Sequence, residues 1–338
     1  MEMKIGKWVK YALSLSVAAV LLYFCFRGVN WREFGMGLLS CKWQFVIFSM
    51  LAGTAAFIFR GLRLRHMVLP LDPATRRITT YDATTIGNMS NFVFPFLGEF
   101  VRCGIVTRRS KVLTFDKTLG AVAVERAWDM LSLVILMVTL LIFKWHEFGG
   151  FFTDRICRPL ATRLGSATLW IGLAVLVIAG CAALFAIIHY RSSNKVCGKI
   201  YSVFDGLLQG FKACFKMDRK WIFFLETAVI WAMYWLQIVF LAEAFPMRCE
   251  DPTFVSGLIT FGLVDALFIM LAGSLASVVP VPGGIGAYHF IVAAALLSIY
   301  GISWDRGLVF ATLSHESQAL TMILTGVISY LHYVIKKD

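Results

Sequence analysis

The sequence predicts an all-α membrane protein, a polytopic bundle of about eight membrane helices or segments. Charged residues make up 15% of its 338 residues and hydrophobic residues 59%, whereas a soluble domain carries about 25% charged residues. Several apolar stretches also reach about 20 residues, the length at which an α-helix spans a hydrocarbon core of about 30 Å. The basic residues collect at alternate ends of these stretches.

Eight apolar stretches account for the membrane segments. Phe24 and Arg27 close the first stretch where a signal peptide would carry small residues before its cleavage site, so we expect it to be retained. Arg60, Arg63 and Arg65 are expected to end the second stretch. We expect the segments at residues 8–26, 43–59, 118–143, 167–189, 221–242, 254–276, 287–299 and 307–335.

The lysines and arginines favour one orientation. With the N-terminus in the cytoplasm and the spans alternating, 22 of the 32 basic residues fall in cytoplasmic segments and 9 in outer segments, and Arg126 lies within a span. Cytoplasmic loops carry an excess of Lys and Arg, so we expect both termini inside. Residues 195–216 have apolar side chains at helical spacing between lysines, which predicts an amphipathic helix on the inner leaflet or packed on the protein.

Residues 80–111 differ from an ordinary span. They are apolar enough to enter the membrane, yet they contain asparagines, a proline and ionisable residues, and basic residues flank both ends. If both flanks are cytoplasmic, the chain must enter and leave on the same side, so we predict a re-entrant hairpin that turns at residues 95–98. Such backbone is tolerated at membrane depth only where protein or a water-filled cavity covers it.

Residues 274–300 repeat this pattern. The sequence VVPVPGG at 278–284 aligns with VFPFLGE at 93–99 and shares with it a valine, a proline and a glycine at equal spacing. Broken apolar segments at corresponding places in two halves point to a transporter's binding site. We therefore predict a second re-entrant segment, related to the first by an inverted repeat, while a chance match over seven residues stays open.

The motif VERAWD places Glu125, Arg126 and Asp129 in the first turns of a membrane helix. Glu125 and Asp129 are four residues apart and share a face. Ionisable residues inside a membrane are costly and suggest a function with a specific partner. We expect Arg126 to pair with Glu99. Arg102 would then pair with Glu125 or Asp129, and a cluster that only holds helices together is the alternative.

No metal or cofactor site is predicted. The eight cysteines are scattered without a CxxC pair, and His315 and Glu316 lack a second histidine at metal-ligand spacing. The sequence contains neither a P-loop nor a GxSxG motif.

The stretches GNMSNFVFPFLGEFVRCGIV, VERAWD and PVPGGIGAYH occur in this order, and the match that they support covers most of the chain. Together they resemble the lysylphosphatidylglycerol synthase transmembrane family of flippase-like membrane proteins. The family pattern is an asparagine, a proline and G-E-x-x-R, then an E-R motif opening a membrane helix, then P-x-P-G-G-[IL]-G. The matching residues here are Asn91, Pro95, Gly98, Glu99, Arg102, Glu125, Arg126 and the run from Pro280 to Gly286.

The resemblance implies a domain that translocates lipids across a bacterial inner membrane. In multidomain relatives it moves an aminoacylated phosphatidylglycerol that a separate soluble domain makes, and we expect no such domain after the last span of this chain. The sequence departs from the family at His289, where relatives often carry an acidic residue. That departure puts the substrate and any acid-dependent coupling in question.

We therefore expect a flippase or transporter that moves a phospholipid, aminoacylated or anionic, or a lipid-linked molecule between leaflets. The planar guanidinium suits phosphate oxygens, so Arg102 and Arg126 would hold a headgroup phosphate while nearby carboxylates balance their charge. The expected substrate-binding residues are Asn88, Asn91, Pro95, Glu99, Arg102, Glu125, Arg126, Asp129, Pro280, Gly283, Gly284, Gly286 and His289.

Two alternatives stay open. One is an enzyme that acts on a lipid-linked substrate in the bilayer, with Glu99 or His289 as acid or base. The other is a membrane scaffold that transports nothing. The expected partner is a membrane phospholipid, without nucleic acid, cofactor or metal, and a homodimer is left open.

Overall fold

The computed structural model describes residues 25–92, 94–145, 220–245, 247–249, 257–258, 261–279 and 281–335, with isolated positions between 16 and 23 and between 153 and 201. Most of the predicted first span, the predicted span at 167–189 and the predicted amphipathic helix at 195–216 lie outside the described residues. Pro280 lies outside them as well.

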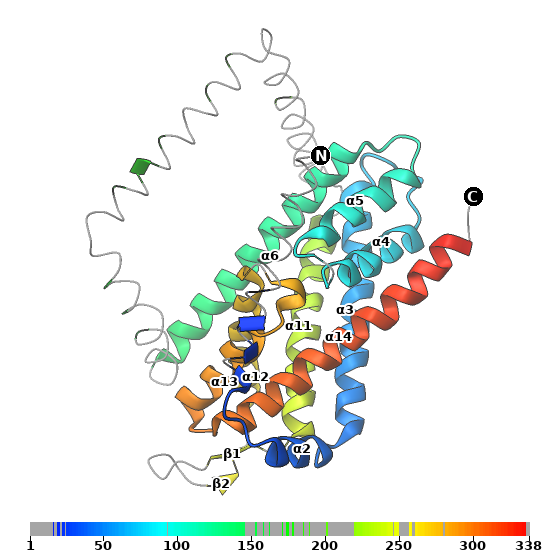
Figure 1. Cartoon of the computed structure of the whole chain (residues 1–338). Coiled ribbons are helices and arrows are strands. Elements are labelled where there is room, and N and C mark those ends of the chain that lie inside the picture. The colour runs from blue at the N-terminus through cyan, green and yellow to red at the C-terminus, as the bar shows by residue number, and fades with distance from the viewer. Residues whose placement is uncertain are drawn as a thin grey trace.

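Four long helices frame the described part of the chain. They are α3 (Trp43–Val68), α6 (Phe115–Phe143), α11 (Lys220–Ala244) and α14 (Trp304–Ile335). α3 and α11 lie side by side, and α14 crosses them (Figure 1). The helices contain 25 to 32 residues, or about 38 to 48 Å at 1.5 Å per residue. Each is long and apolar enough to cross a membrane, so the chain is an α-helical membrane protein, as predicted.

Helix α3 runs past the end predicted for the second span. It continues to Val68, so the prediction that Arg60, Arg63 and Arg65 end the helix is wrong. Leu64 and Met67 are fully buried in this extension. The first two arginines do not mark a polar boundary, because carboxylates from neighbouring helices neutralise them inside the bundle.

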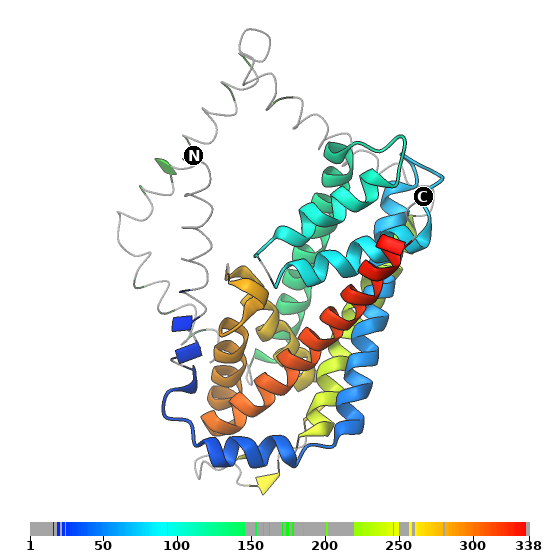
Figure 2. The ribbon, with the colours of Figure 1, turned by 45° about the vertical axis from the view of Figure 1, so that its right-hand side comes forward.

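A first helical hairpin consists of α4 (Arg77–Ser90) and α5 (Leu97–Arg108), and residues 91–92 and 94–96 form turns between them. The two helices lie side by side (Figure 2). Glycines permit this approach, because a Cβ on Gly98 would overlap the carbonyl oxygen of Gly87 and lie 2.7 Å from Asn91 Oδ1. The turn comes slightly before the predicted 95–98. That this hairpin re-enters the membrane stays a prediction.

A second helical hairpin consists of α12 (Leu263–Ser274) and α13 (Ala287–Tyr300). Short 3-10 turns lie between them at Leu275–Val278 and Pro282–Gly284. The stretch Pro282–Tyr300 is as long and apolar as a membrane span, but positive φ angles at Gly283 and Gly286 interrupt the helix. With 12 and 14 residues, α12 and α13 are about 18 and 21 Å long, which is too short to cross about 30 Å of hydrocarbon.

This hairpin corrects two predictions. The span predicted at 254–276 is wrong, because helix α12 begins only at Leu263. Before it, β2 (Gly257–Leu258) pairs antiparallel with β1 (Arg248–Cys249). The helical hairpin therefore begins at Leu263, earlier than the predicted segment at 274–300, and that this segment re-enters the membrane stays a prediction. Hydropathy alone extended the span because the residues before Leu263 are also apolar.

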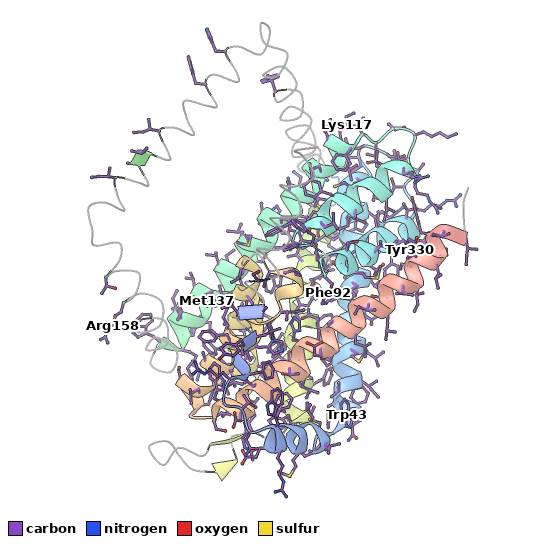
Figure 3. The ribbon with its side chains drawn as sticks, viewed as in Figure 1. Trp43, Phe92, Lys117, Met137, Arg158 and Tyr330 are labelled. Atoms are coloured by element: carbon purple, nitrogen blue, oxygen red, sulfur yellow. The ribbon has the colours of Figure 1, made fainter. Side chains whose placement is uncertain are left out.

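The two hairpins come from opposite ends of the bundle, and their tips meet between the ends (Figures 1 and 2). The backbone N–H of Gly283 donates to the carbonyl oxygen of Asn91 at 3.1 Å. A Cβ on Gly283 would lie 2.6 Å from the ring of Phe92, and its φ of +62° also favours glycine. In Figure 3, Phe92 lies between Lys117 at one end of the bundle and Trp43 at the other. The stretches aligned in the sequence thus occupy corresponding hairpin tips.

The described residues form two large apolar clusters, one around each hairpin, and a small third cluster of Ala276, Val281 and Ala287 at the tip of the second hairpin. The cluster around the first hairpin joins α3, α4, α5 and α6 and includes Leu64, Ala83 and Val122. The larger cluster joins α11, α12, α13 and α14, and it includes Phe268 and Phe310. Helix α2 (Trp31–Leu39) closes one end of the bundle, next to the start of α3 (Figure 1). Each hairpin is therefore fixed by its own core, and the tips form the junction.

Replacing Gly98 by alanine should force α4 and α5 apart, because the new Cβ would overlap the Gly87 carbonyl oxygen. We expect the thermal unfolding midpoint of the detergent-purified protein to fall by several degrees, since overpacking costs about 1–3 kcal/mol. The matched control is Gly104→Ala in the same helix, where a Cβ would have nothing within 4 Å. The control should leave the midpoint unchanged or raise it. Equal effects of the two changes would contradict this close packing.

Candidate functional site

Seven ionisable side chains from three helices form one cluster where the first hairpin packs on the frame. We call it the arginine–carboxylate cluster. It carries four formal positive charges and three negative ones. Its members are Arg60 and Arg63 from α3, Glu99 and Arg102 from α5, and Glu125, Arg126 and Asp129 from α6.

Glu125 lies at the centre of the cluster, and its side chain has no exposed surface. Its Oε2 accepts a hydrogen bond from Arg102 Nη2 at 2.8 Å. Its Oε1 lies 3.1 Å from Arg63 Nη2 and 3.2 Å from Arg126 Nη2, with Arg60 Nη2 at 3.8 Å. A buried carboxylate without such partners would be strongly destabilising. Glu125 therefore holds arginines from three helices around a single point.

The other two carboxylates bridge arginines at the edge of the cluster. Glu99 contacts Arg102 and Arg126, each at 3.1 Å. Asp129 lies 2.8 Å from Arg63 Nη1 and 3.4 Å from Arg126 Nη1. The predicted pair of Arg126 with Glu99 is confirmed. Of the two partners predicted for Arg102, the structure selects Glu125.

Sequence reasoning missed Arg60 and Arg63, which it assigned to a cytoplasmic loop. Arg63 is fully buried, and its Nη1 also donates to Thr227 Oγ1 of α11 at 3.2 Å. A signal was present, because the two arginines are three residues apart and so share a helix face. Leucine and methionine follow them at helical spacing, as expected for a helix that continues.

The cluster has unused capacity to bind an anion. Positive charge exceeds negative charge by one, and the buried Nε atoms of Arg60, Arg63 and Arg102 have no hydrogen-bond partner among the described residues. Buried donors without acceptors are costly. Arg126 is also the most accessible member, with 37% of its side chain exposed. An incoming anionic oxygen would meet Arg126 first and the buried guanidinium groups behind it.

Asn88 joins the cluster, whereas Asn91 and Pro95 shape the hairpin. Asn88 Oδ1 accepts from Arg60 Nη1 at 3.3 Å, and its buried Nδ2 has no partner among the described residues. Asn91 Oδ1 accepts from the backbone N–H of Gly98 at 2.7 Å and so fixes the start of α5. Pro95 lies in the turn between α4 and α5. The predicted binding residues on this hairpin thus divide into polar groups at the cluster and residues that support its backbone.

The predicted site residues of the second hairpin lie at its tip. Gly283, Gly284 and Gly286 all have positive φ angles, a conformation that glycine adopts at little cost. His289 follows in the first turn of α13, where its ring contacts Phe26 and His315. None of these four belongs to the arginine–carboxylate cluster. They connect to the first hairpin through the hydrogen bond from Gly283 to Asn91.

Comparison with known proteins agrees with this architecture. The lysylphosphatidylglycerol synthase TM region matches residues 11–326 of the chain. The chain belongs to this family. It is also similar to the glycosyltransferase AglD of Haloferax volcanii, with 24% identity over 299 residues. That match covers 80% of this chain but 46% of the relative, so the chain corresponds to less than half of that protein.

The replacement Glu125→Gln should destabilise the protein strongly. It keeps the shape of the side chain but leaves Arg63 and Arg102 without their shared counter-charge, and breaking a buried ion pair costs about 3–5 kcal/mol. We expect a large drop in the thermal unfolding midpoint or a loss of folded protein. The control is Asp116→Asn in the first turn of the same helix, which should cost less than about 1 kcal/mol. A Glu125→Gln protein as stable as the control would show that this carboxylate does not organise the cluster.

Proposed function

We propose that this chain is a lipid flippase that moves a phospholipid, or another lipid carrying a phosphate, between the leaflets of the bacterial inner membrane. The observation that carries the proposal is the arginine–carboxylate cluster, with its excess positive charge. It lies on the hairpin whose tip meets a second hairpin from the opposite end of the bundle. Membership of the lysylphosphatidylglycerol synthase TM family supports it.

The chemistry of the cluster suits a headgroup phosphate. Arginine and phosphate form bidentate, charge-assisted hydrogen bonds that are about twice as strong as neutral ones. Arg126 would make the first contact because of its exposure, and Arg102 would follow. Glu99 and Asp129 are each about one-fifth exposed, so they could bind a cationic group on the same headgroup, as an aminoacylated lipid carries.

The paired hairpins suggest how a headgroup would pass. Broken helices that meet near the bilayer midplane are the usual binding sites of transporters built from inverted repeats. Here α12 and α13 are too short to span, and both tips lie between the ends of the bundle. We infer that the headgroup crosses beside these tips while the acyl chains stay in the surrounding lipid.

We infer the orientation from the basic residues. The end of the bundle where α3 ends and α6 begins carries Arg65, Arg108, Lys117 and Lys220. Removing Arg60, Arg63 and Arg102 from the predicted cytoplasmic count of 22 leaves 19, against 9 outside. By the positive-inside rule, this end would face the cytoplasm, with both termini on the same side.

An enzyme acting on a lipid-linked substrate is the second candidate, favoured by the name of the haloarchaeal relative. The matched region covers 46% of that protein, so the named activity can belong to the remainder. A flippase can act only in a bilayer with two leaflets, whereas an enzyme does not need one. An enzyme would form product from a lipid-linked substrate in detergent, where a flippase would release none.

A leaflet assay tests the proposal. The protein is reconstituted into liposomes with headgroup-labelled lipids, and a membrane-impermeant quencher reports the label in the outer leaflet. We expect wild type to allow quenching beyond the outer-leaflet half. Arg126→Gln should slow this about 10- to 100-fold, because a hydrogen bond to a charged group contributes about 1.5–3 kcal/mol. Lys117→Gln, which removes a positive charge from the end of the same helix, should behave like wild type.

Wild-type quenching that stops at half for anionic, neutral and aminoacylated lipids would contradict translocation. Thermal unfolding of each variant shows whether it is folded. If Arg126→Gln lowered the unfolding midpoint but left lipid movement unchanged, the cluster would hold helices together without binding the headgroup.

A further inference from the structure

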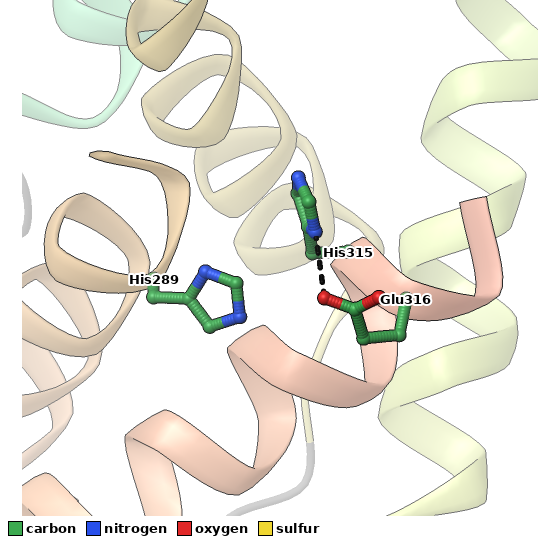
Figure 4. Close-up of side chains that lie close together, drawn as sticks. All are labelled: His289, His315 and Glu316. Carbon is green, nitrogen blue, oxygen red and sulfur yellow. Dashed lines mark hydrogen bonds and ion pairs between the residues drawn. The ribbon is translucent and has the colours of Figure 1, made fainter. Parts of the chain in front are cut away.

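A second polar group lies beside the tip of the second hairpin, apart from the arginine–carboxylate cluster. It consists of His289 in the first turn of α13 and His315 and Glu316 in α14 (Figure 4). One ligand atom from each side chain lies within 4.8 Å of the others. Both histidines are buried, whereas 59% of the Glu316 side chain is exposed. The two histidines therefore form the buried side of the group, and Glu316 forms its solvent-accessible side.

The two polar contacts of the His315 ring favour a bound cation or proton beside it. Its Nε2 lies 2.9 Å from the carbonyl oxygen of Gly283, so this nitrogen carries a proton and donates it. In a neutral imidazole the other nitrogen then carries a lone pair and can only accept a hydrogen bond. That Nδ1 lies 3.1 Å from Glu316 Oε1, which is also an acceptor. The contact is favourable only if an added proton lies between the two atoms or a metal ion beside them binds both.

The position of Glu316 within helix α14 also favours a bound cation. It is 12 residues from the start of the 32-residue helix α14 and 19 from its end, so it lies far from both ends of a membrane-spanning helix. A carboxylate at such depth is costly unless a partner neutralises it. His289 offers an additional donor, since one of its ring nitrogens faces the other two side chains (Figure 4).

We propose that His289, His315 and Glu316 bind a divalent transition-metal ion, with Zn²⁺ as the best match. Two imidazoles and one carboxylate form a common zinc ligand set that leaves a fourth position open. The hydrogen bond from His315 to Gly283 is the outer contact that fixes the tautomer of a metal-ligating histidine. Zinc bonds of about 2.1 Å place ligands about 3.4 Å apart. His315 Nδ1 and Glu316 Oε1, 3.1 Å apart, are already near this spacing, so binding would mainly require His289, within 4.8 Å of them, to move inward by about 1 Å.

The ion would act on the hairpin junction. It would link α13 to α14 and hold His315 in the orientation in which its Nε2 donates a hydrogen bond to the Gly283 carbonyl oxygen. Gly283 in turn donates its N–H to Asn91 of the first hairpin. Metal binding would therefore fix the tip of the second hairpin against the first.

Direct measurement of bound zinc tests the site. The full chain is purified in detergent through a tag without histidines, treated with a chelator, equilibrated with Zn²⁺ and desalted before its metal content is determined. We expect about one zinc ion per wild-type chain and at least about tenfold weaker binding in His289→Phe and Glu316→Gln. The control His66→Gln, whose histidine pairs with Glu226 at 2.9 Å, should bind zinc like wild type.

Stability provides a second readout. Zn²⁺ should raise the thermal unfolding midpoint of wild type, because a ligand that binds the folded state stabilises it, and should leave that of the two variants unchanged. Phenylalanine at position 289 keeps a ring against Phe26, and Glu316 is exposed, so at least one variant should fold. Wild type that retains no zinc, or variants that bind it equally well, would overturn the proposal and leave a protonated His315 paired with Glu316.

Discussion

The placement of one carboxylate inside the bundle constrains three helices at once. Glu125 has no exposed surface and contacts arginines from α3, α5 and α6. Moving any of these helices would separate charges in a low-dielectric interior, which costs several kcal/mol per ion. The first hairpin is therefore fixed by electrostatics as well as by its glycine contact. Its own arginine, Arg102, is buried against Glu125, so hairpin and cluster form one unit.

The long helices were predictable because length and hydropathy suffice for them. α6, α11 and α14 begin and end within about three residues of their predicted limits, as local apolar character decides where a span can lie. The end of α3 and the start of α12 were not predicted correctly, for opposite reasons. Distant carboxylates neutralise the arginines that should have ended α3. Before α12, Gly257–Leu258 forms a short strand, which hydropathy does not distinguish from helix.

The ion pairs were predictable in part. Glu99 and Arg102 are three residues apart and Glu125 and Asp129 four, so each pair shares a helix face. These residues also stand in motifs typical of the family, which is why pairs such as Arg126 with Glu99 were predicted from the sequence. Arg63 reaches Glu125 across 62 positions of the chain, and His289 reaches His315 across 26. Such contacts depend on how helices pack, and spacing along a single sequence carries no information about them. The same limit explains why two histidines far apart in sequence gave no sign of a shared site.

The contact between the two hairpin tips is weaker than the ion pairs that hold the first hairpin in the bundle. A backbone hydrogen bond from Gly283 to Asn91 and the packing of Phe92 join the tips, and a backbone hydrogen bond contributes only about 1 kcal/mol. The arginine–carboxylate cluster resists separation far more strongly. Separating the tips would therefore cost less free energy than separating the first hairpin from α3 and α6. A state with separated tips, about 1–2 kcal/mol above the closed one, would hold about 3–15% of the molecules, and the bundle would open at its middle without unfolding.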